Sequence, residues 1–311
     1  MNKKSIQEIG ERKLNGIPLE INRMTIGMCN EVYELKYKSN SFILRMNKEK
    51  EWIYGTHKFL PLFQKLQIKT PKIVAEDYSK TEFQFCYQIQ TKLEGKDLGL
   101  VIHKLNPSNL KQIAKEVSNI FDKFNSFPYG NDFGMITGLN EEKYENLLVV
   151  IENQRKTIIQ RNKSTNVIDK ETKEIHNKLL KDYNNYFLGV KPKLYYDDIC
   201  SKNVLVHNGE FNGLVDLDFL MKGDYLEAIG RMIASWHGDN LGEIYIQEII
   251  KLQNLNEFQQ KIIRVYAILN LILWTSEEGI KFNSNSTGEI NWLKVGNKKR
   301  KILELFNSLK E

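Results

Sequence analysis

The chain has 311 residues, of which 41% are hydrophobic and 27% are charged, and it carries a formal net charge of +6. This composition excludes fibrous and disordered proteins, because it supplies a core for one large or two medium-sized domains. The basic residues form no stripe interleaved with aromatics, and the three cysteines include no Cys-x-x-Cys pair, so we expect neither a nucleic-acid partner nor a disulfide framework.

The N-terminal part of the chain is predicted to be rich in β-strands. Residues 31–38 and 41–47 alternate polar and apolar side chains, which predicts a half-buried hairpin, and residues 83–93 are a further strand candidate. Between them, residues 48–66 carry apolar side chains at helical spacing. We expect this helix to stop before Thr70-Pro71, because a residue that precedes proline disfavours the helical conformation.

After Gly95 the pattern becomes helical. A helix over 107–127 should bury one apolar face, and an irregular segment, 194–203, leads into a hairpin within 203–219. Further helices are expected at 141–161, 168–188, 224–236, 243–252, 256–278 and 290–310. We therefore predict an α+β fold with a small antiparallel β lobe, residues 1–94, a hinge at about 90–97, and a larger helical lobe, residues 98–311, with a cleft between the lobes.

The most apolar segment, residues 262–274, is too short to span a membrane, and it contains Arg264 and Asn270. The N-terminal lysines are not followed by an apolar stretch, so a secretory signal is not expected. Unpaired cysteines are typical of a reducing compartment. We therefore expect a cytoplasmic monomer without a membrane partner.

Three polar residues have the spacing of a phosphoryl-transfer site. Asp198 and Asn203 lie in the irregular segment, and Asp216 follows thirteen residues after Asn203 within an apolar run. One carboxylate can accept the proton of an attacking hydroxyl, while an amide oxygen and a second carboxylate can hold Mg²⁺ on the phosphates of a nucleotide. The alternative is that the three residues only form turns around the hairpin, because Asp and Asn favour loops for local reasons.

The sequence around these residues resembles a known family of kinases. The segments YDDICSKNVLV (196–206) and GLVDLD (213–218) are similar to motifs of the aminoglycoside phosphotransferases and choline-kinase-like kinases, distant relatives of protein kinases. Those motifs read His-Gly-Asp-x-His-x-x-Asn and Gly-hydrophobic-hydrophobic-Asp-x-Asp/Glu. The resemblance implies a two-lobe protein-kinase-like fold and transfer of the γ-phosphate of ATP or GTP to a hydroxyl.

Roles for the catalytic segment follow from this resemblance. Asp198 matches the catalytic Asp, while Asn203, Asp216 and Asp218 match positions that hold Mg²⁺. Lys202 stands where glycine is usual, and we expect it to reach a phosphate oxygen. The cofactors implied are therefore Mg²⁺ and ATP, or GTP, as the phosphate donor.

The catalytic segment departs from the family pattern at three positions. Tyr196 and Cys200 replace its two histidines, the first at a largely structural position, and Asp197 replaces its glycine. We assign Cys200 no catalytic role, because a free cysteine is more often a small apolar side chain than a nucleophile. Residues 223–232 are similar to the family's Gly-Asp-Pro-x-x-Asp-Leu-Ala pattern, in which Glu227 is expected to tether the backbone of the catalytic loop.

The small lobe carries the residues that the resemblance assigns to the nucleotide. Arg45 sits where the family has a lysine or arginine on the α and β phosphates, and its acidic partner is Glu51, our first choice, or Glu49. A turn within 25–36 would cover the phosphates, and the linker 88–98 would offer backbone groups to adenine. The residues assigned in these two segments are Gly27, Met28, Cys29, Asn30, Gln90, Thr91, Lys92 and Leu93.

Acidic residues are concentrated around the catalytic segment. Between Leu194 and Ile250 there are ten acidic and three basic residues, a local net charge of −7. Six of the carboxylates have no assigned role, and with Glu210 at a hairpin tip and Glu248 on a helix surface set aside, four remain that would attract a cationic acceptor. They are Asp197, Asp224, Asp239 and Glu243. For Asp239 and Glu243 the alternative, that they cap a helix, is equally open.

The sequence therefore predicts a small-molecule kinase. We expect the acceptor to be a cationic antibiotic, an aminoglycoside or a related amino sugar, whose phosphorylation would confer resistance. Two alternatives remain open: a metabolic kinase of choline, a sugar or an amino alcohol, in which an aromatic cage would serve a quaternary ammonium, and a kinase-like protein that binds without catalysing.

Overall fold

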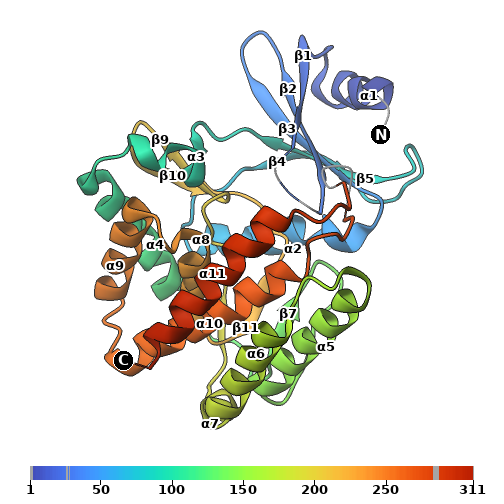
Figure 1. The fold of residues 1–311 in the computed structure, drawn as a ribbon. Coiled ribbons are helices and arrows are strands. Elements are labelled where there is room, and N and C mark those ends of the chain that lie inside the picture. Colours follow the sequence, from blue (N-terminus) through green and yellow to red (C-terminus); the bar gives the residue numbers. More distant parts are fainter. Residues whose placement is uncertain (1–2, 26, 28, 283–286, 311) are drawn as a thin grey trace.

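The computed structural model describes residues 3–25, 27, 29–282 and 287–310 (Figure 1). Met28, one of the residues assigned to the nucleotide, lies outside them. Among the described residues, no helix is long and apolar enough to cross a membrane.

A five-stranded antiparallel sheet forms the small lobe, in the order β1-β2-β3-β5-β4. Its strands are β1 (Glu20–Met24), β2 (Glu31–Lys36), β3 (Ser41–Asn47), β4 (Ile73–Asp77) and β5 (Cys86–Thr91). The predicted hairpin is confirmed as β2 and β3, with Lys36 opposite Ser41 and Glu31 opposite Met46. The strand candidate at 83–93 is confirmed as the shorter β5.

Alternation along these strands gives the sheet two different faces. Leu35, Leu44 and Met46 are fully buried in one apolar cluster with Ile6 and Ile9 of the N-terminal helix α1 (Lys3–Leu14). The side chains between these buried positions, such as Arg45, therefore point to the other face of the sheet. That face looks towards the helical lobe (Figure 1).

The predicted helix over 48–66 is broken in two. A single 3₁₀ turn (Lys50–Trp52) precedes α2 (Gly55–Lys65). The chain turns as it leaves β3, because the Asn47 side chain accepts a hydrogen bond from the backbone N–H of Glu49 at 2.9 Å. Phe59 and Phe63 of α2 pack in the large core of the helical lobe. The division of the chain at residue 94 stays a prediction.

Two small sheets hold the catalytic segment. One has the order β10-β9-β6, from β6 (Lys96–Asp97), β9 (Val204–His207) and β10 (Glu210–Leu214). The other has the order β7-β11-β8, from β7 (Gly134–Ile136), β8 (Lys193–Tyr195) and β11 (Leu220–Gly223). The hairpin predicted within 203–219 is confirmed as β9 and β10. Its turn, Asn208-Gly209, has positive φ at both residues, 52° and 84°, as a tight hairpin requires.

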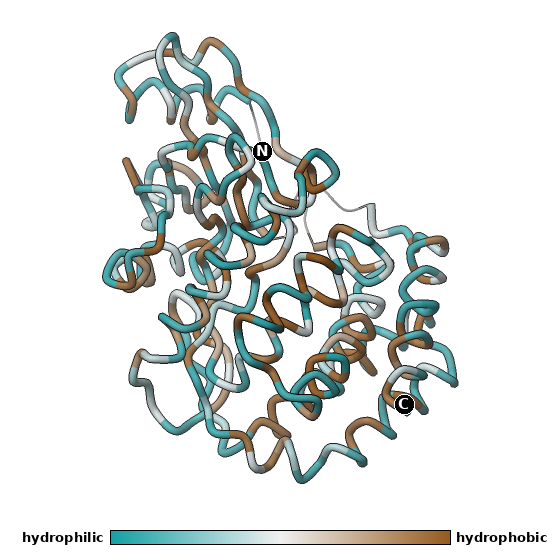
Figure 2. Tube along the Cα trace, turned by 90° about the vertical axis from the view of Figure 1, so that its left-hand side faces the viewer, coloured by the Kyte–Doolittle hydropathy of each residue, from teal (hydrophilic) through white to brown (hydrophobic). Residues whose placement is uncertain are grey.

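The helices close the core of the larger lobe. They are α3 (Leu98–Val101), a 3₁₀ turn (Ile102–Lys104), α4 (Pro107–Asn125), α5 (Leu147–Thr165), α6 (Lys170–Asp182), α7 (Asn184–Gly189), α8 (Leu226–Trp236), α9 (Asn240–Leu252), α10 (Glu257–Thr275) and α11 (Trp292–Ser308). The helix expected at 141–161 begins later, because Asn146 caps it by accepting the N–H of Val149 at 3.1 Å. The one expected at 168–188 is divided into α6 and α7. Figure 2 shows apolar and polar residues alternating along the helices of this lobe.

Candidate active site

A cleft of about 240 Å³ is lined by residues of both lobes. Most of the residues that the sequence assigned to catalysis, metal and nucleotide line it. They are Gly27, Cys29, Asn30, Arg45, Gln90, Thr91, Lys92, Leu93, Asp198, Lys202, Asn203 and Asp216. The structure thus brings together segments that are more than a hundred residues apart in the sequence, as a site between two lobes requires.

Asp198 lies in the irregular loop between β8 and β9, and its neighbours fix both carboxylate oxygens. Asn203 donates to Oδ2 at 2.7 Å and to the backbone carbonyl of Asp198 at 2.8 Å. The Cys200 thiol donates to Oδ1 at 3.3 Å, and burial raises the pKa of this thiol, so that it stays protonated. Lys202 Nζ lies 3.4 Å from Oδ2. The loop therefore presents one carboxylate in a defined orientation.

Asp216 follows β10 in a left-handed conformation. Its φ is +64°, a value that aspartate and asparagine adopt more readily than other non-glycine residues. The hydroxyl of Tyr196, which is buried, lies 3.1 Å from the carbonyl of Asp216 and 3.0 Å from that of Val215. Tyr196 thus holds this turn in place, which agrees with the structural role expected at its position. The Asp216 side chain is 41% exposed.

Arg231 of α8 is one residue near this site that the sequence reasoning missed. It lies 2.9 Å from Glu227, 3.2 Å from Asp197 and 3.8 Å from Asp198. Its spacing of four residues from Glu227 on one helix was the available signal. Arg231 connects the loop that carries Asp198 to α8, and it compensates the charge of Asp197.

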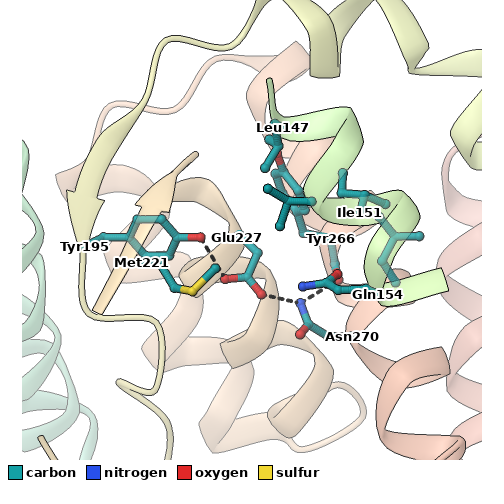
Figure 3. Close-up of a pocket in the computed structure, with 10 residues that line it drawn as sticks. Leu147, Ile151, Gln154, Tyr195, Met221, Glu227, Tyr266 and Asn270 are labelled. Carbon is teal, nitrogen blue, oxygen red and sulfur yellow. Dashed lines mark hydrogen bonds between the residues drawn. The ribbon is translucent and has the colours of Figure 1, made fainter. Parts of the chain in front are cut away.

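The role expected for Glu227 is wrong. Its carboxylate accepts hydrogen bonds from side chains, Arg231, Asn270 at 3.0 Å and the Tyr195 hydroxyl at 3.2 Å, and none of these is a backbone group of the catalytic loop. Figure 3 shows Glu227 between Tyr195 and Asn270 beside a small cavity that Gln154 also lines. Glu227 acts on the loop indirectly, because it holds Arg231.

The other carboxylates expected to attract a cation also have structural partners. Asp239 caps α9 by accepting the N–H of Gly242 at 2.8 Å, and Glu243 accepts the N–H of Gly238 at 3.3 Å. These contacts favour the capping alternative. Asp224 is 7% exposed and accepts from the hydroxyls of Tyr186 and Tyr266, the latter at 2.9 Å. A buried carboxylate with these donors is a core anchor, so its assignment to the acceptor is wrong.

We expect Asp224→Ala to lower the free energy of unfolding by about 3 kcal/mol, because it leaves the buried hydroxyl of Tyr266 and the half-buried hydroxyl of Tyr186 without an acceptor. Urea denaturation followed by circular dichroism measures this loss. Asp182→Ala, which removes a half-exposed carboxylate paired with Lys178 at 2.7 Å, is the control and should change stability by less than about 1 kcal/mol. A stable Asp224→Ala protein with weakened acceptor binding would contradict the anchor role.

Arg45 has different partners from those expected. The side chain is buried, with Nη2 at 2.7 Å from Asp216 and in contact with Asp218. Glu51 instead accepts hydrogen bonds from Thr137 at 3.2 Å and Asn140 at 2.5 Å. The predicted Arg45–Glu51 pair is therefore wrong, and the alternative partner, Glu49, is 3.8 Å from Lys80.

Asp218 does not line the cleft, although the family pattern assigns it to the metal. Its side chain is 1% exposed and contacts Thr56, Arg45 and Asn30. Another acid, Asp97, does line the cleft, on the side of the linker. Burial raises the pKa of Asp97 to about 6. The Gly-x-Asp-Leu sequence of the linker was the available signal for this residue.

The residues that remain at the cleft fit Mg²⁺. Among the described residues no group of three or more Asp, Glu, His or Cys side chains could enclose a metal by itself. Mg²⁺ commonly takes only one or two carboxylates from the protein and completes its shell with phosphates and water. Asp216 supplies a carboxylate, and Asn203 uses its nitrogen for the contacts to Asp198, which leaves an amide oxygen for a hard cation.

The sequence and the fold were compared with known proteins. A model of the phosphotransferase enzyme family matches residues 20–254, about three quarters of the chain. No curated protein sequence gives a significant match. The fold is similar to a crystal structure of a thermostable mutant of aminoglycoside phosphotransferase APH(4)-Ia in ternary complex with AMP-PNP and hygromycin B, with a TM-score of 0.74, 14% identity and coverage of 98% of each chain.

Two further solved structures extend this comparison. Aminoglycoside phosphotransferase APH(2'')-Ib with bound ADP has a TM-score of 0.65 and 12% identity, over 98% of this chain and 99% of that one. A putative fructosamine-3-kinase from Haemophilus somnus has a TM-score of 0.65 and 12% identity, over 97% of each chain. Identities this low establish the fold alone. The predicted fold class, an antiparallel β lobe with a larger helical lobe of the kinase-like type, is confirmed.

Proposed function

The chain belongs to the phosphotransferase enzyme family, and from this premise we propose that it transfers the terminal phosphate of ATP, or GTP, to a hydroxyl of a small molecule. The observation that carries the proposal is the position of Asp198. Its carboxylate lies in the same cleft as Asp216, Lys202 and Arg45, with an orientation fixed by Asn203. Such a carboxylate can accept the proton of the attacking hydroxyl.

The cations of the cleft suit the phosphates. Arg45 and Lys202 enter the cleft from opposite lobes, and Asp198 and Asp216 raise the pKa of Lys202 against the effect of burial, so that it stays charged. Mg²⁺ held by Asp216 and Asn203 would neutralise further charge on the phosphates. Catalysis would rest on positioning and on charge neutralisation, without a covalent intermediate.

The linker side of the cleft suits a nucleobase. The apolar side chains of Val32, Ile43 and Leu205 line the cleft together with residues 90–93 of the linker. A slot lined by apolar side chains is suited to a purine, which stacks on its faces. ATP and GTP remain equally compatible with this slot.

For the acceptor we propose an aminoglycoside or a related amino sugar, and hence a role in antibiotic resistance. Support comes from structural neighbours that are aminoglycoside phosphotransferases, one of them bound to hygromycin B. The carboxylates counted in the sequence give no support, because they have structural partners. The fructosamine-kinase neighbour favours a sugar derivative as the second candidate.

The test is nucleotide consumption against a panel of acceptors. Wild type would be assayed with ATP and with GTP, with and without Mg²⁺, against aminoglycosides including hygromycin B, a fructosamine, simple sugars and choline. We expect Mg²⁺-dependent turnover with an amino sugar, and turnover about a thousandfold lower with Asp198→Ala. A protein that binds no nucleotide with Mg²⁺ and phosphorylates no acceptor would instead support the non-catalytic alternative.

A further inference from the structure

Asp218 makes more contacts than its place in a metal motif explains. It lies two residues after Asp216, but its side chain does not line the cleft and is 1% exposed. Oδ1 accepts from the backbone N–H of Thr56 at 3.0 Å, from the Thr56 hydroxyl at 2.8 Å and from Arg45 Nη1 at 3.3 Å. Oδ2 accepts from Arg45 Nη2 and from Asn30 Nδ2, the latter at 3.2 Å.

The N-terminus of α2 is docked on this residue. Gly55, the first residue of α2, lies so close that a Cβ built on it would be 1.9 Å from the carbonyl oxygen of Asp218. The residue that precedes the helix, Tyr54, provides no side-chain cap. The carboxylate of Asp218 therefore supplies the acceptor that the first turn needs, and the positive end of the helix stabilises its charge.

Arg45 is held by this docked carboxylate. Its guanidinium is buried, and a buried charge is tolerated only when it is paired and hydrogen-bonded. Nη1 donates to the Thr56 hydroxyl at 2.9 Å, and that hydroxyl donates to Asp218, which closes a ring of three side chains. Asp216, the other partner, is 41% exposed in the cleft. Asp216 can thus turn to another partner while Asp218 continues to hold Arg45.

We propose that Asp218 is a positioning residue that fixes Arg45 for the phosphates of the nucleotide, in place of the helix glutamate expected for that role, and that it is not a ligand of Mg²⁺. This inference rests on the proposed function, because it assumes that the cleft binds a nucleoside triphosphate. Through Asn30, which also donates to the carbonyl of Trp52 at 3.1 Å, Asp218 further fixes the segment expected to cover the phosphates.

The experiment separates the two roles by measuring nucleotide binding with and without metal. AMP-PNP is titrated calorimetrically into the full chain, in EDTA and in Mg²⁺. Asp218→Asn keeps the side-chain shape but sets an amide against the guanidinium, so we expect affinity in EDTA to fall about tenfold or more. The gain in affinity on adding Mg²⁺ should stay within about twofold of wild type. Asp216→Asn, the matched comparison two residues away, should show the reverse pattern.

A double-mutant cycle tests whether Asp218 acts through Arg45. Arg45→Lys keeps the charge but loses the planar fork that contacts Asp218 and Thr56. If Asp218 acts by holding this fork, Arg45→Lys should change affinity in EDTA by less than about twofold when Asp218→Asn is already present. Additive losses would overturn the proposal.

Further outcomes are decisive. If Asp218→Asn abolishes the increase in AMP-PNP affinity on adding Mg²⁺ and leaves the affinity in EDTA unchanged, Asp218 is a metal ligand and the inference is wrong. If wild type binds no AMP-PNP at all, the proposed function fails instead.

Thr56→Val is the alternative variant to measure if Asp218→Asn does not fold. It keeps the carboxylate of Asp218 and removes only the hydroxyl of Thr56. This variant should bind AMP-PNP in EDTA about threefold more weakly than wild type, with the same increase in affinity on adding Mg²⁺. An unchanged affinity in EDTA would overturn the proposal.

Discussion

Replacing Asp198 with alanine should lower kcat about a thousandfold, while the affinity for nucleotide changes by no more than about threefold. The carboxylate is placed to accept the proton of the acceptor hydroxyl, and without it the hydroxyl must attack while still protonated. Nucleotide affinity should survive, because Gln90 and Arg45, which we assign to the base and the phosphates, belong to strands of the small lobe and not to the loop of Asp198.

Alanine is the better substitution here. An asparagine at 198 would set a second amide against the side-chain nitrogen of Asn203, which donates to Asp198 at 2.7 Å, and would disturb a residue assigned to the metal. Steady-state kinetics with the acceptor identified by the panel, combined with calorimetric titration of nucleotide, measures both quantities. Glu210→Ala, at the exposed start of β10, is the control and should behave as wild type.

The opposite result would change the assignment. A large loss of nucleotide affinity, with kcat at saturating nucleotide close to that of wild type, would place Asp198 among the groups that hold the nucleotide. A second acid of the same loop, Asp197, would then become the candidate for the base. It is poorly placed for that role, because its side chain does not line the cleft and lies 3.2 Å from Arg231.

The sequence predicts best what depends on neighbours along the chain. The β2–β3 hairpin follows from alternation, and the turn Asn208-Gly209 from the residue types that allow positive φ. The catalytic loop belongs to the same class. Asn203 follows Asp198 by five residues, so a short irregular loop is sufficient to bring the amide onto the carboxylate.

Contacts between distant segments could not be predicted from the sequence. The partner of Arg45 is decided by how closely α2 approaches residue 218, and that approach depends on the absence of a side chain at Gly55. Nothing in the sequence of α2 signals this docking. The glutamate that the family pattern suggested, Glu51, lies instead against Thr137 and Asn140.

Charge counting failed for a related reason. A count over the sequence cannot distinguish a carboxylate that faces a cleft from one that caps a helix or anchors a core. Asp239 and Asp224 are of the second kind, because their oxygens accept hydrogen bonds from a helix N-terminus and from tyrosine hydroxyls. The density of acid around the catalytic segment therefore reflects the anchoring of loops and helices as much as it reflects chemistry.

Substitution of Asp216 should remove the gain in nucleotide affinity that Mg²⁺ provides. Its carboxylate is the exposed acid of the pair 216 and 218, and it lies in the cleft beside Asn203 and Arg45. With Asp218 engaged by Thr56 and Arg45, no second carboxylate of this turn is available to replace it. Without Asp216 the metal would keep only a neutral amide oxygen from the protein, which holds Mg²⁺ weakly.

The choice of variant matters, because φ at this position is +64°. Alanine would add the strain of a left-handed conformation, about 1 kcal/mol, to the loss of the carboxylate, whereas asparagine tolerates that conformation and keeps the shape. Asp216→Asn should therefore have a melting temperature close to that of wild type and bind AMP-PNP in EDTA with nearly unchanged affinity. Its calorimetric titrations with and without Mg²⁺ should coincide. If Mg²⁺ raises the AMP-PNP affinity of this variant as much as it raises that of wild type, the metal is held elsewhere in the cleft.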